Sequence, residues 1–166
     1  MKKIVFFSFL FFAGIAGYAQ GSLAEGGKQL NAGVGFSNYG APVYVGLDFG
    51  VHESITVGPR VSFRRYNFNY GAGRYNQSLI GLSFNGNYHF NKILDLPKEL
   101  DVYAGLTLGY YIWTDINVAG YSANTSGLGL DGQLGARYFF TDQFGLNIEF
   151  GGGYNSGGGF GITYKF

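Results

Sequence analysis

Apolar and polar residues alternate along most of this 166-residue chain. The clearest segment runs from Val43 to Val51, where every second residue is Val, Leu or Phe and the residues between are Tyr, Gly or Asp. Strict alternation is typical of a β-strand with one apolar and one polar face. Eight such segments follow one another, and the pattern therefore predicts an all-β protein. The segments lie at residues 30–36, 43–51, 55–64, 80–90, 102–112, 128–138, 144–150 and 157–166.

Two features interrupt this regular pattern. Pro59 lies inside the third segment and has no amide hydrogen for a sheet hydrogen bond, so it predicts a bulge or a local gap in pairing with a neighbouring strand. The link from Asn91 to Leu100 contains Leu94, Leu96 and Pro97, and we expect a compact turn with a short helical piece.

Composition decides what kind of all-β protein this is. Aromatic residues make up 19% of the chain and charged residues only 13%, a balance that favours contact with lipid over water. After residue 20 no run of apolar residues is long enough for a membrane-spanning helix. A closed barrel is the other structure that satisfies its backbone in lipid. The alternative, glycine-rich disorder, is disfavoured by the regular alternation. We therefore predict an eight-stranded antiparallel transmembrane β-barrel.

The first nineteen residues are typical of a cleavable signal peptide. Lys2 and Lys3 precede an apolar run from residue 4 to residue 16, and small residues precede a cleavage site between Ala19 and Gln20. A single membrane helix is the alternative, and the short run disfavours it. The barrel domain is then residues 20–166. Removing Lys2 and Lys3 from the eleven Lys and Arg residues leaves nine, against ten Asp and Glu, and this balance does not indicate a nucleic-acid partner.

Charged residues within the predicted strands fall almost entirely on the polar face. A Lys or Arg facing lipid near the bilayer midplane costs roughly 2 to 4 kcal/mol, so these side chains are expected to face the lumen. We predict diagonal salt bridges across hairpins between Asp48 and Arg60 and between Arg137 and Glu149. A polar plug is the favoured interpretation, because eight strands enclose a space that side chains can fill. A conducting pore is the alternative. The predicted lumen charge network is Asp48, Arg60, Arg64, Asp131, Arg137, Glu149 and Lys165.

The last strand carries a more specific motif. It ends Ile162-Thr163-Tyr164-Lys165-Phe166, with bulky apolar or aromatic residues at every second position. This end resembles the C-terminal assembly signal of bacterial outer-membrane proteins, which the barrel-assembly machinery recognises. Nearly the whole chain after the signal peptide resembles a small eight-stranded outer-membrane barrel of the OmpA/OmpX type. The resemblance implies a place in bacterial outer-membrane lipid. It also implies a role as an anchor, an adhesion or host-interaction protein, a narrow channel or, rarely, a lipid-modifying enzyme.

The connections between strands predict an orientation. Longer links follow the odd-numbered strands and shorter links mostly follow the even-numbered ones, which places the longer links outside the cell and both termini in the periplasm. The loops at residues 67–78 and 115–126 are then candidate surfaces for an extracellular protein or glycan. Aromatic residues are expected to form two interfacial girdles. One contains Phe49, Tyr88, Phe90, Tyr138, Phe144, Tyr164 and Phe166, and the other Phe36, Phe63, Tyr66, Tyr110 and Phe160.

No motif predicts catalysis or a cofactor. His52-Glu53-Ser54 resembles the His-x-Ser arrangement of a lipid A deacylase, but the triplet lies in a predicted periplasmic turn, on the wrong side for that substrate. His89 is expected to hydrogen-bond within the plug, and two scattered histidines without cysteine make a poor metal site. We therefore expect a non-enzymatic barrel with a structural or surface-interaction role. The alternatives are a narrow channel for small or hydrophobic solutes and, less favoured, a lipid-modifying enzyme.

Overall fold

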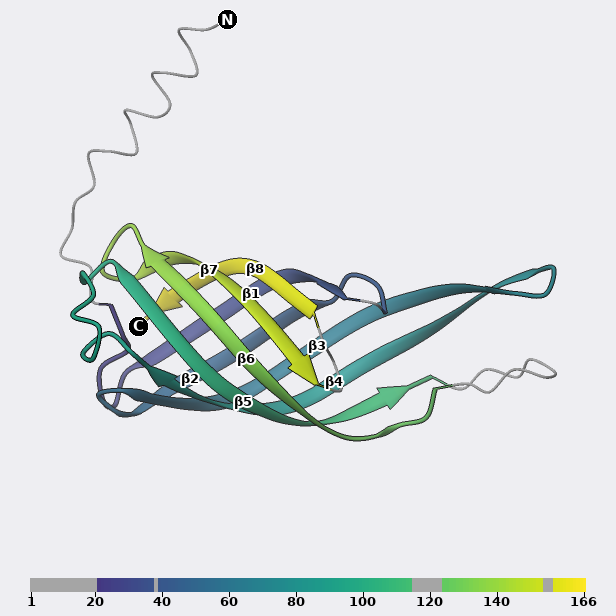
Figure 1. The fold of residues 1–166 in the computed structure, drawn as a ribbon, viewed down its shortest axis with the longest axis horizontal. Coiled ribbons are helices and arrows are strands. Elements are labelled where there is room, and N and C mark those ends of the chain that lie inside the picture. The colour runs from purple at the N-terminus through teal and green to yellow at the C-terminus, as the bar shows by residue number, and fades with distance from the viewer. Residues whose placement is uncertain (1–20, 38, 115–123, 154–156) are drawn as a thin grey trace, which may run out of the picture.

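A computed structural model describes residues 21–37, 39–114, 124–153 and 157–166, in which eight antiparallel strands close into a barrel (Figure 1). Each strand pairs with the next, and β1 pairs with β8, so the barrel is closed all the way round. No helix in this part of the chain is long and apolar enough to cross a membrane. The strands are β1 (Lys28–Ser37), β2 (Val43–His52), β3 (Ile55–Tyr70), β4 (Gly73–His89), β5 (Leu100–Trp113), β6 (Gly127–Phe139), β7 (Phe144–Gly153) and β8 (Gly157–Lys165).

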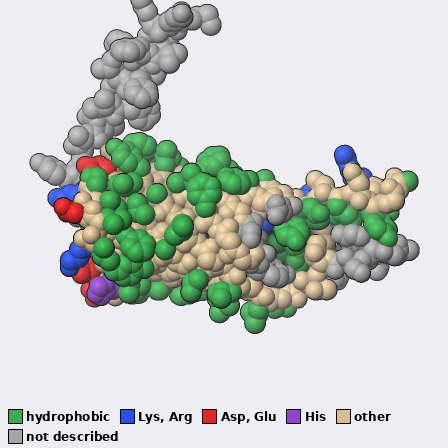
Figure 2. All heavy atoms as spheres, in the orientation of Figure 1, with side chains coloured by type: hydrophobic (Ala, Val, Ile, Leu, Met, Phe, Trp, Pro, Cys, Tyr) green, Lys and Arg blue, Asp and Glu red, His purple; other side chains and the backbone are tan. Residues whose placement is uncertain are grey.

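The barrel wall separates apolar from polar side chains in the way that the alternation predicts. Leu106 and Leu134 are 60% and 64% exposed, whereas Asp48 and Arg137 are each 1% exposed. Figure 2 shows hydrophobic side chains spread over the wall, with acidic and basic side chains gathered at one end and a few basic ones at the other. An apolar exterior around a polar interior suits a barrel surrounded by hydrocarbon. The predicted all-β class and eight-stranded closed barrel are confirmed.

Strands β3 and β4 are longer than the sequence predicts. Residues 67–78, expected to form a loop, are mostly strand, and the chain turns at Gly71 (φ 58°) and Ala72. Within residues 65–78 the two strands pair with each other, but β3 no longer pairs with β2 and β4 does not yet pair with β5. We call this segment the β3–β4 ribbon. The residues of this segment that face outward are polar, as in a loop. Tyr66, Phe68 and Tyr75 nevertheless continue the strand alternation on the inward-facing side. Of the second predicted loop, residues 115–123 lie outside the described residues.

The two interruptions in the pattern have different outcomes. Pairs between β2 and β3 run up to Gly46–Arg60 and resume at Phe49–Val57, so the gap predicted at Pro59 is confirmed. The short helical piece predicted within residues 91–100 is wrong. The link forms single hydrogen-bonded turns, because Asp95 has a positive φ of 48° and Pro97 has no amide hydrogen.

The two ends of the barrel differ. At one end, which we call the terminal end, lie Phe166 and the links after β2, β4 and β6; at the other, the hairpin end, strands β1, β3, β5 and β7 finish (Figure 1). Residues 21–27 lie over the terminal end, running from the β4–β5 link, where Gly21 lies against the Leu100 carbonyl, to β1. The Gly26 amide donates to the Gly50 carbonyl (2.8 Å), and Leu23 is buried. This segment therefore caps the lumen. The residues expected to form the assembly signal, Ile162, Tyr164 and Phe166, are exposed on the outer surface.

Inward-facing glycines make room for aromatic rings in the narrow lumen. A Cβ atom on Gly135 would lie 2.7 Å from Cε2 of Tyr103, and one on Gly33 would lie 2.8 Å from Cζ of Tyr44. Both rings are held in place by hydrogen bonds of their hydroxyl groups, to Glu149 and Asn147 respectively. Glycine at these positions thus allows a tyrosine ring to lie against the neighbouring strand, over the residue with which the tyrosine pairs.

This packing predicts different effects for two glycines of β6. Gly135→Ala should destabilise the barrel by about 1 to 3 kcal/mol, because Tyr103 cannot move away without losing its hydrogen bond. Gly132→Ala is the matched control, since the nearest atom to a Cβ there is 3.9 Å away. Urea unfolding of both variants in lipid vesicles measures the difference. Equal midpoints for the two variants would show that the ring does not require the glycine.

Candidate functional site

A buried ion cluster fills the lumen near the terminal end. Nη2 of Arg137 donates to Oδ2 of Asp48 (2.7 Å), and Nη1 donates to Oδ2 of Asp101 (3.3 Å). Asp48 also accepts hydrogen bonds from the side-chain amides of Asn31 (2.9 Å) and Asn85 (3.0 Å). The guanidinium of Arg137 lies 4.4 Å from the centre of the Tyr103 ring. Each buried charge therefore has an opposite charge and further hydrogen bonds, which is the condition for tolerating it away from water.

A second ion pair crosses the lumen closer to the hairpin end. Nη1 of Arg60 donates to Oε1 of Glu149 (2.5 Å) and Nη2 donates to Oε2 (3.0 Å), and the hydroxyl of Tyr103 donates to Oε2 (2.9 Å). The Arg60 guanidinium also lies 5.1 Å from the centre of the Tyr44 ring. The bidentate geometry fixes the orientation of both side chains. Because Arg60 is on β3 and Glu149 on β7, this pair joins opposite walls of the barrel.

The salt bridges differ from the pairs predicted across hairpins. Arg60 pairs with Glu149 instead of Asp48, and Arg137 pairs with Asp48 instead of Glu149. The prediction considered neighbouring strands alone, where diagonal residues are roughly 7 to 8 Å apart. In a barrel of eight strands the opposite wall is within reach of a long arginine side chain. The same four side chains are thus used, with their partners exchanged.

The other predicted lumen charges also face inward. Nη1 of Arg64 donates to Oγ of Ser37 (2.8 Å), and Asp131 accepts from the Tyr111 hydroxyl (2.6 Å). Nζ of Lys165 donates to the carbonyl of Gly21 (2.7 Å) beneath the cap. Sequence reasoning missed Asp101, which is fully buried and pairs with Arg137. Its position two residues before the inward-facing Tyr103 was the signal that could have found it.

His89 belongs to the same buried cluster. Its Nδ1 lies 2.7 Å from Oδ1 of Asp101, and its Nε2 lies 2.9 Å from Oγ1 of Thr56. A hydroxyl, an imidazole and a carboxylate in this order resemble a catalytic triad. However, none of the three is more than 2% exposed, and all lie beneath the cap. The three side chains are therefore closed off from solvent, and the hydrogen bonds orient His89 within the buried cluster.

The triplet His52-Glu53-Ser54 has no nucleophile geometry. Nδ1 of His52 accepts from the backbone amide of Ser54 (3.2 Å), while Glu53 pairs with Lys92 at 2.8 Å on the surface. The hydrogen bond from Lys92 lowers the pKa of Glu53. Within the described residues no group of three or more His, Cys, Asp or Glu side chains is arranged to hold a metal ion.

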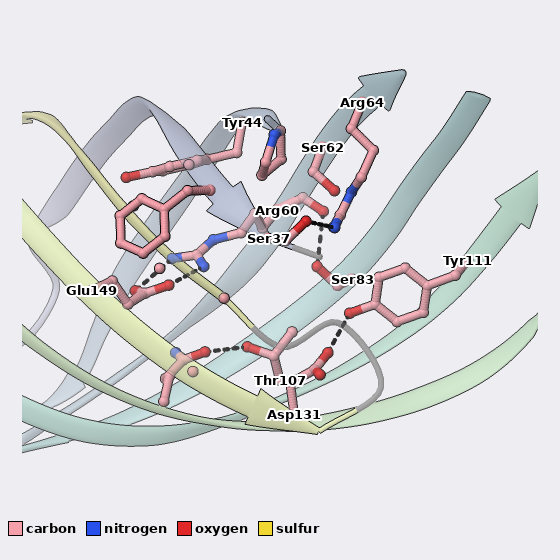
Figure 3. A pocket seen from close by; sticks show the side chains of 18 of the residues that line it. Ser37, Tyr44, Arg60, Ser62, Arg64, Ser83, Thr107, Tyr111, Asp131 and Glu149 are labelled. Carbon is pink, nitrogen blue, oxygen red and sulfur yellow. Dashed lines mark hydrogen bonds and ion pairs between the residues drawn. The ribbon is translucent and has the colours of Figure 1, made fainter. Parts of the chain in front are cut away.

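A cavity of about 100 Å³ lies in the lumen on the hairpin side of the Arg60–Glu149 pair. Its wall is mixed: Phe36 and Pro42 contribute apolar surface, and Ser37, Ser62 and Ser83 contribute hydroxyl groups (Figure 3). Inward glycines such as Gly35 and Gly159 leave the space unfilled. The ion pair forms one side of the cavity and separates it from the cluster around Arg137.

An aromatic cluster adjoins the cavity at the hairpin end. The ring of Tyr39 lies 5.5 Å from those of Tyr66 and Trp113, and Trp113 packs with Leu79 and Tyr111. Tyr66 was expected in the outer girdle, and that placement is wrong. The residue lies on the inward face, because β3 continues past the last residue that β2 pairs with and keeps its alternation.

Comparison with known proteins supports the fold alone. No model of a known protein family matches the sequence, and no curated protein matches it. Among solved structures, the outer membrane protein OprG from Pseudomonas aeruginosa matches with a TM-score of 0.66 and 12% identity, over 89% of this chain and 99% of its own. The N-terminal β-barrel domain of OprF from the same organism matches with 0.60 and 15%, over 86% and 98%.

A third match is the attachment invasion locus protein Ail of Yersinia pestis, in complex with the heparin analogue sucrose octasulfate. Its TM-score is 0.54 at 12% identity, over 86% of this chain and 99% of that one. This chain has the fold of the small eight-stranded outer-membrane β-barrels. The likeness expected from the alternation and the terminal strand is therefore confirmed at the level of the fold.

The exchanged salt bridges can be tested with a double-mutant cycle in this outer-membrane-type barrel. Glu149→Ala should lower the urea midpoint of unfolding, because it leaves Arg60 without its carboxylate. Loss of one partner of a buried pair typically costs about 3 to 5 kcal/mol, and the adjoining cavity should reduce that value. Adding Arg60→Ala should recover part of the loss.

The control cycle combines Glu149→Ala with Arg137→Ala, a pair joined by no direct hydrogen bond. Its coupling energy should be smaller. A larger coupling for Arg137 than for Arg60 would favour the hairpin pairing over the one described above. Glu53→Ala, which breaks the exposed pair with Lys92, should hardly change the midpoint.

Proposed function

We propose that the protein is an integral protein of the bacterial outer membrane with a closed lumen, and that it acts structurally or through its surface. The single observation that carries the proposal is the buried cluster around Arg137, which joins β2, β5 and β6 through Asp48 and Asp101. The apolar exterior supports the membrane location. No enzymatic step is part of the proposal.

Two layers of charge and one segment of backbone obstruct passage through the lumen. A solute entering from the hairpin end meets the Arg60–Glu149 pair first, then the Arg137 cluster, and finally residues 21–27 over the terminal end. Opening one pair would leave buried charges without partners, which is costly. Three obstacles in series therefore support a plug.

A narrow channel is the second candidate. The observation that favours it is the cavity beside Arg60 and Glu149, which becomes the vestibule of a channel if all three obstacles move. The protein would then pass small polar solutes through the lumen. The two candidates differ in whether the resting barrel conducts.

Single-channel recording in planar bilayers separates the two candidates. We expect the refolded chain without residues 1–19 to show no steady conductance steps. The variant combining Arg60→Ala with Glu149→Ala should also remain silent, because the cluster around Arg137 still closes the lumen. A general porin, inserted in the same way, serves as the positive control. Steady open steps from the unmodified barrel would replace the plug with the channel.

The β3–β4 ribbon supports a role at the cell surface. Its strands continue for six residues beyond Arg64, a distance of about 20 Å at the usual rise of a strand. Ail, which shares the fold, was solved in complex with a heparin analogue, and this supports a surface ligand for the present barrel. We propose that the hairpin end faces outside the cell and that the ribbon takes part in contacts there.

The orientation predicts which engineered cysteines react on intact cells. The chain contains no cysteine, so single substitutions give unambiguous labelling. Ala72→Cys at the ribbon tip should react with an impermeant thiol reagent, and Gln143→Cys at the terminal end should react only after the outer membrane is permeabilised. The reverse labelling pattern would show that the barrel has the opposite orientation in the membrane.

A further inference from the structure

The outward face of the barrel carries very few charges, and they are unevenly distributed. Along the eight strands, the described residues that face outward include three charged side chains, all of them basic. Lys28 lies at the terminal end, whereas Arg65 and Arg74 lie on the β3–β4 ribbon. The chain has no Asp or Glu between Glu53 and Asp95, so no acidic residue of the hairpin balances these arginines.

The two arginines are part of a continuous polar surface, which we call the basic strip. Cross-strand pairing places Arg65 opposite Ser78, Asn67 opposite Asn76, and Asn69 opposite Arg74. Five of these six side chains are exposed, and no described residue forms a salt bridge with either arginine. In Figure 2 the charged side chains visible on the ribbon are basic. The strip consists of guanidinium, amide and hydroxyl groups along about 13 Å of ribbon.

The location of the basic strip indicates what it contacts. Outward-facing residues alternate along a strand, so Arg65 follows Phe63 on the same face, and Ser78 precedes Ile80. Phe63 and Ile80 are exposed apolar residues of the barrel wall. The strip therefore begins one step beyond the apolar wall, at the height where hydrocarbon gives way to headgroups. Its guanidinium groups suit phosphate, which they bind in a bidentate manner.

We propose that the basic strip binds phosphate-bearing headgroups of the lipid leaflet at the hairpin end. This interaction anchors the ribbon to the membrane surface. The inference rests on the proposed membrane location, and it adds a binding site outside the lumen that is independent of whether the barrel conducts. A basic residue close to an anionic membrane surface contributes about 1 kcal/mol, so removing one arginine should weaken the interaction on the order of fivefold.

Electron paramagnetic resonance of a nitroxide at Ala72→Cys tests the proposal. The barrel is placed in nanodiscs of phosphatidylcholine with increasing fractions of phosphatidylglycerol. The label should lose mobility as the anionic fraction rises, and added salt should reverse the effect because it screens exposed charges. Arg65→Gln and Arg74→Gln should each shift the titration to higher anionic fractions, and the double variant should show little response.

Three controls make the outcome decisive. Lys28→Gln, which removes the outward charge at the terminal end, should leave the titration unchanged. The migration of unheated samples in gel electrophoresis shows separately whether the barrel is folded. This distinguishes an unfolded variant from a folded barrel that has lost its lipid site. Inorganic phosphate added to discs of phosphatidylcholine alone should not slow the label.

Two results would overturn the proposal. The first is an equal response to anionic lipid in the double variant, which would show that other groups hold the ribbon. The second is a mobility of the label that does not change with anionic lipid but decreases when heparin is added to phosphatidylcholine discs. In this case the double variant should not respond to heparin. The basic strip would then be a receptor for a soluble polyanion and not a lipid site.

Discussion

The structure depends on the requirement that every backbone hydrogen-bonding group inside a hydrocarbon layer be satisfied by the protein itself. Pairing β1 with β8 meets this requirement by closing the sheet. Closure fixes which side chains face lipid and which face each other across a narrow lumen. Most charged residues of the strands then face the lumen and find their hydrogen-bonding partners there, and the three that face outward lie at the terminal end or on the β3–β4 ribbon. The exchanged salt bridges, the glycines beneath tyrosines and the cap all follow from that confinement.

The lumen has two parts with different properties. Near the terminal end, polar and charged side chains fill the interior, and nearly all of their polar atoms are hydrogen-bonded. Towards the hairpin end, inward glycines on β1, β7 and β8 leave a cavity instead. The lumen is thus packed in its terminal half and contains a cavity in its hairpin half. Substitutions around the cavity can change its shape without disturbing the packed half, because the Arg60–Glu149 pair lies between the two.

Much of the fold could be predicted because successive residues of a strand face opposite sides of the sheet, so the alternation of apolar and polar residues shows which side chains face lipid and which face the lumen. The pairing of charges could not be predicted in the same way. Asp48 lies near Arg60 along the hairpin, but the decisive distances run across the lumen and depend on barrel diameter and strand stagger. The ribbon was missed because Asn67 and Asn76 resemble loop residues, and strand pairing beyond the membrane needs no apolar outer face.

The cross-lumen salt bridges have a mechanical consequence. Arg60 on β3 is joined to Glu149 on β7, and Arg137 on β6 is joined to Asp48 on β2. In the closed ring of eight strands, β3 lies opposite β7 and β2 lies opposite β6. The two salt bridges therefore span the diameter of the barrel in two directions and act as struts. Lateral pressure from the surrounding bilayer would flatten an empty cylinder into an ellipse. The struts oppose that deformation in two directions and keep the cross-section round.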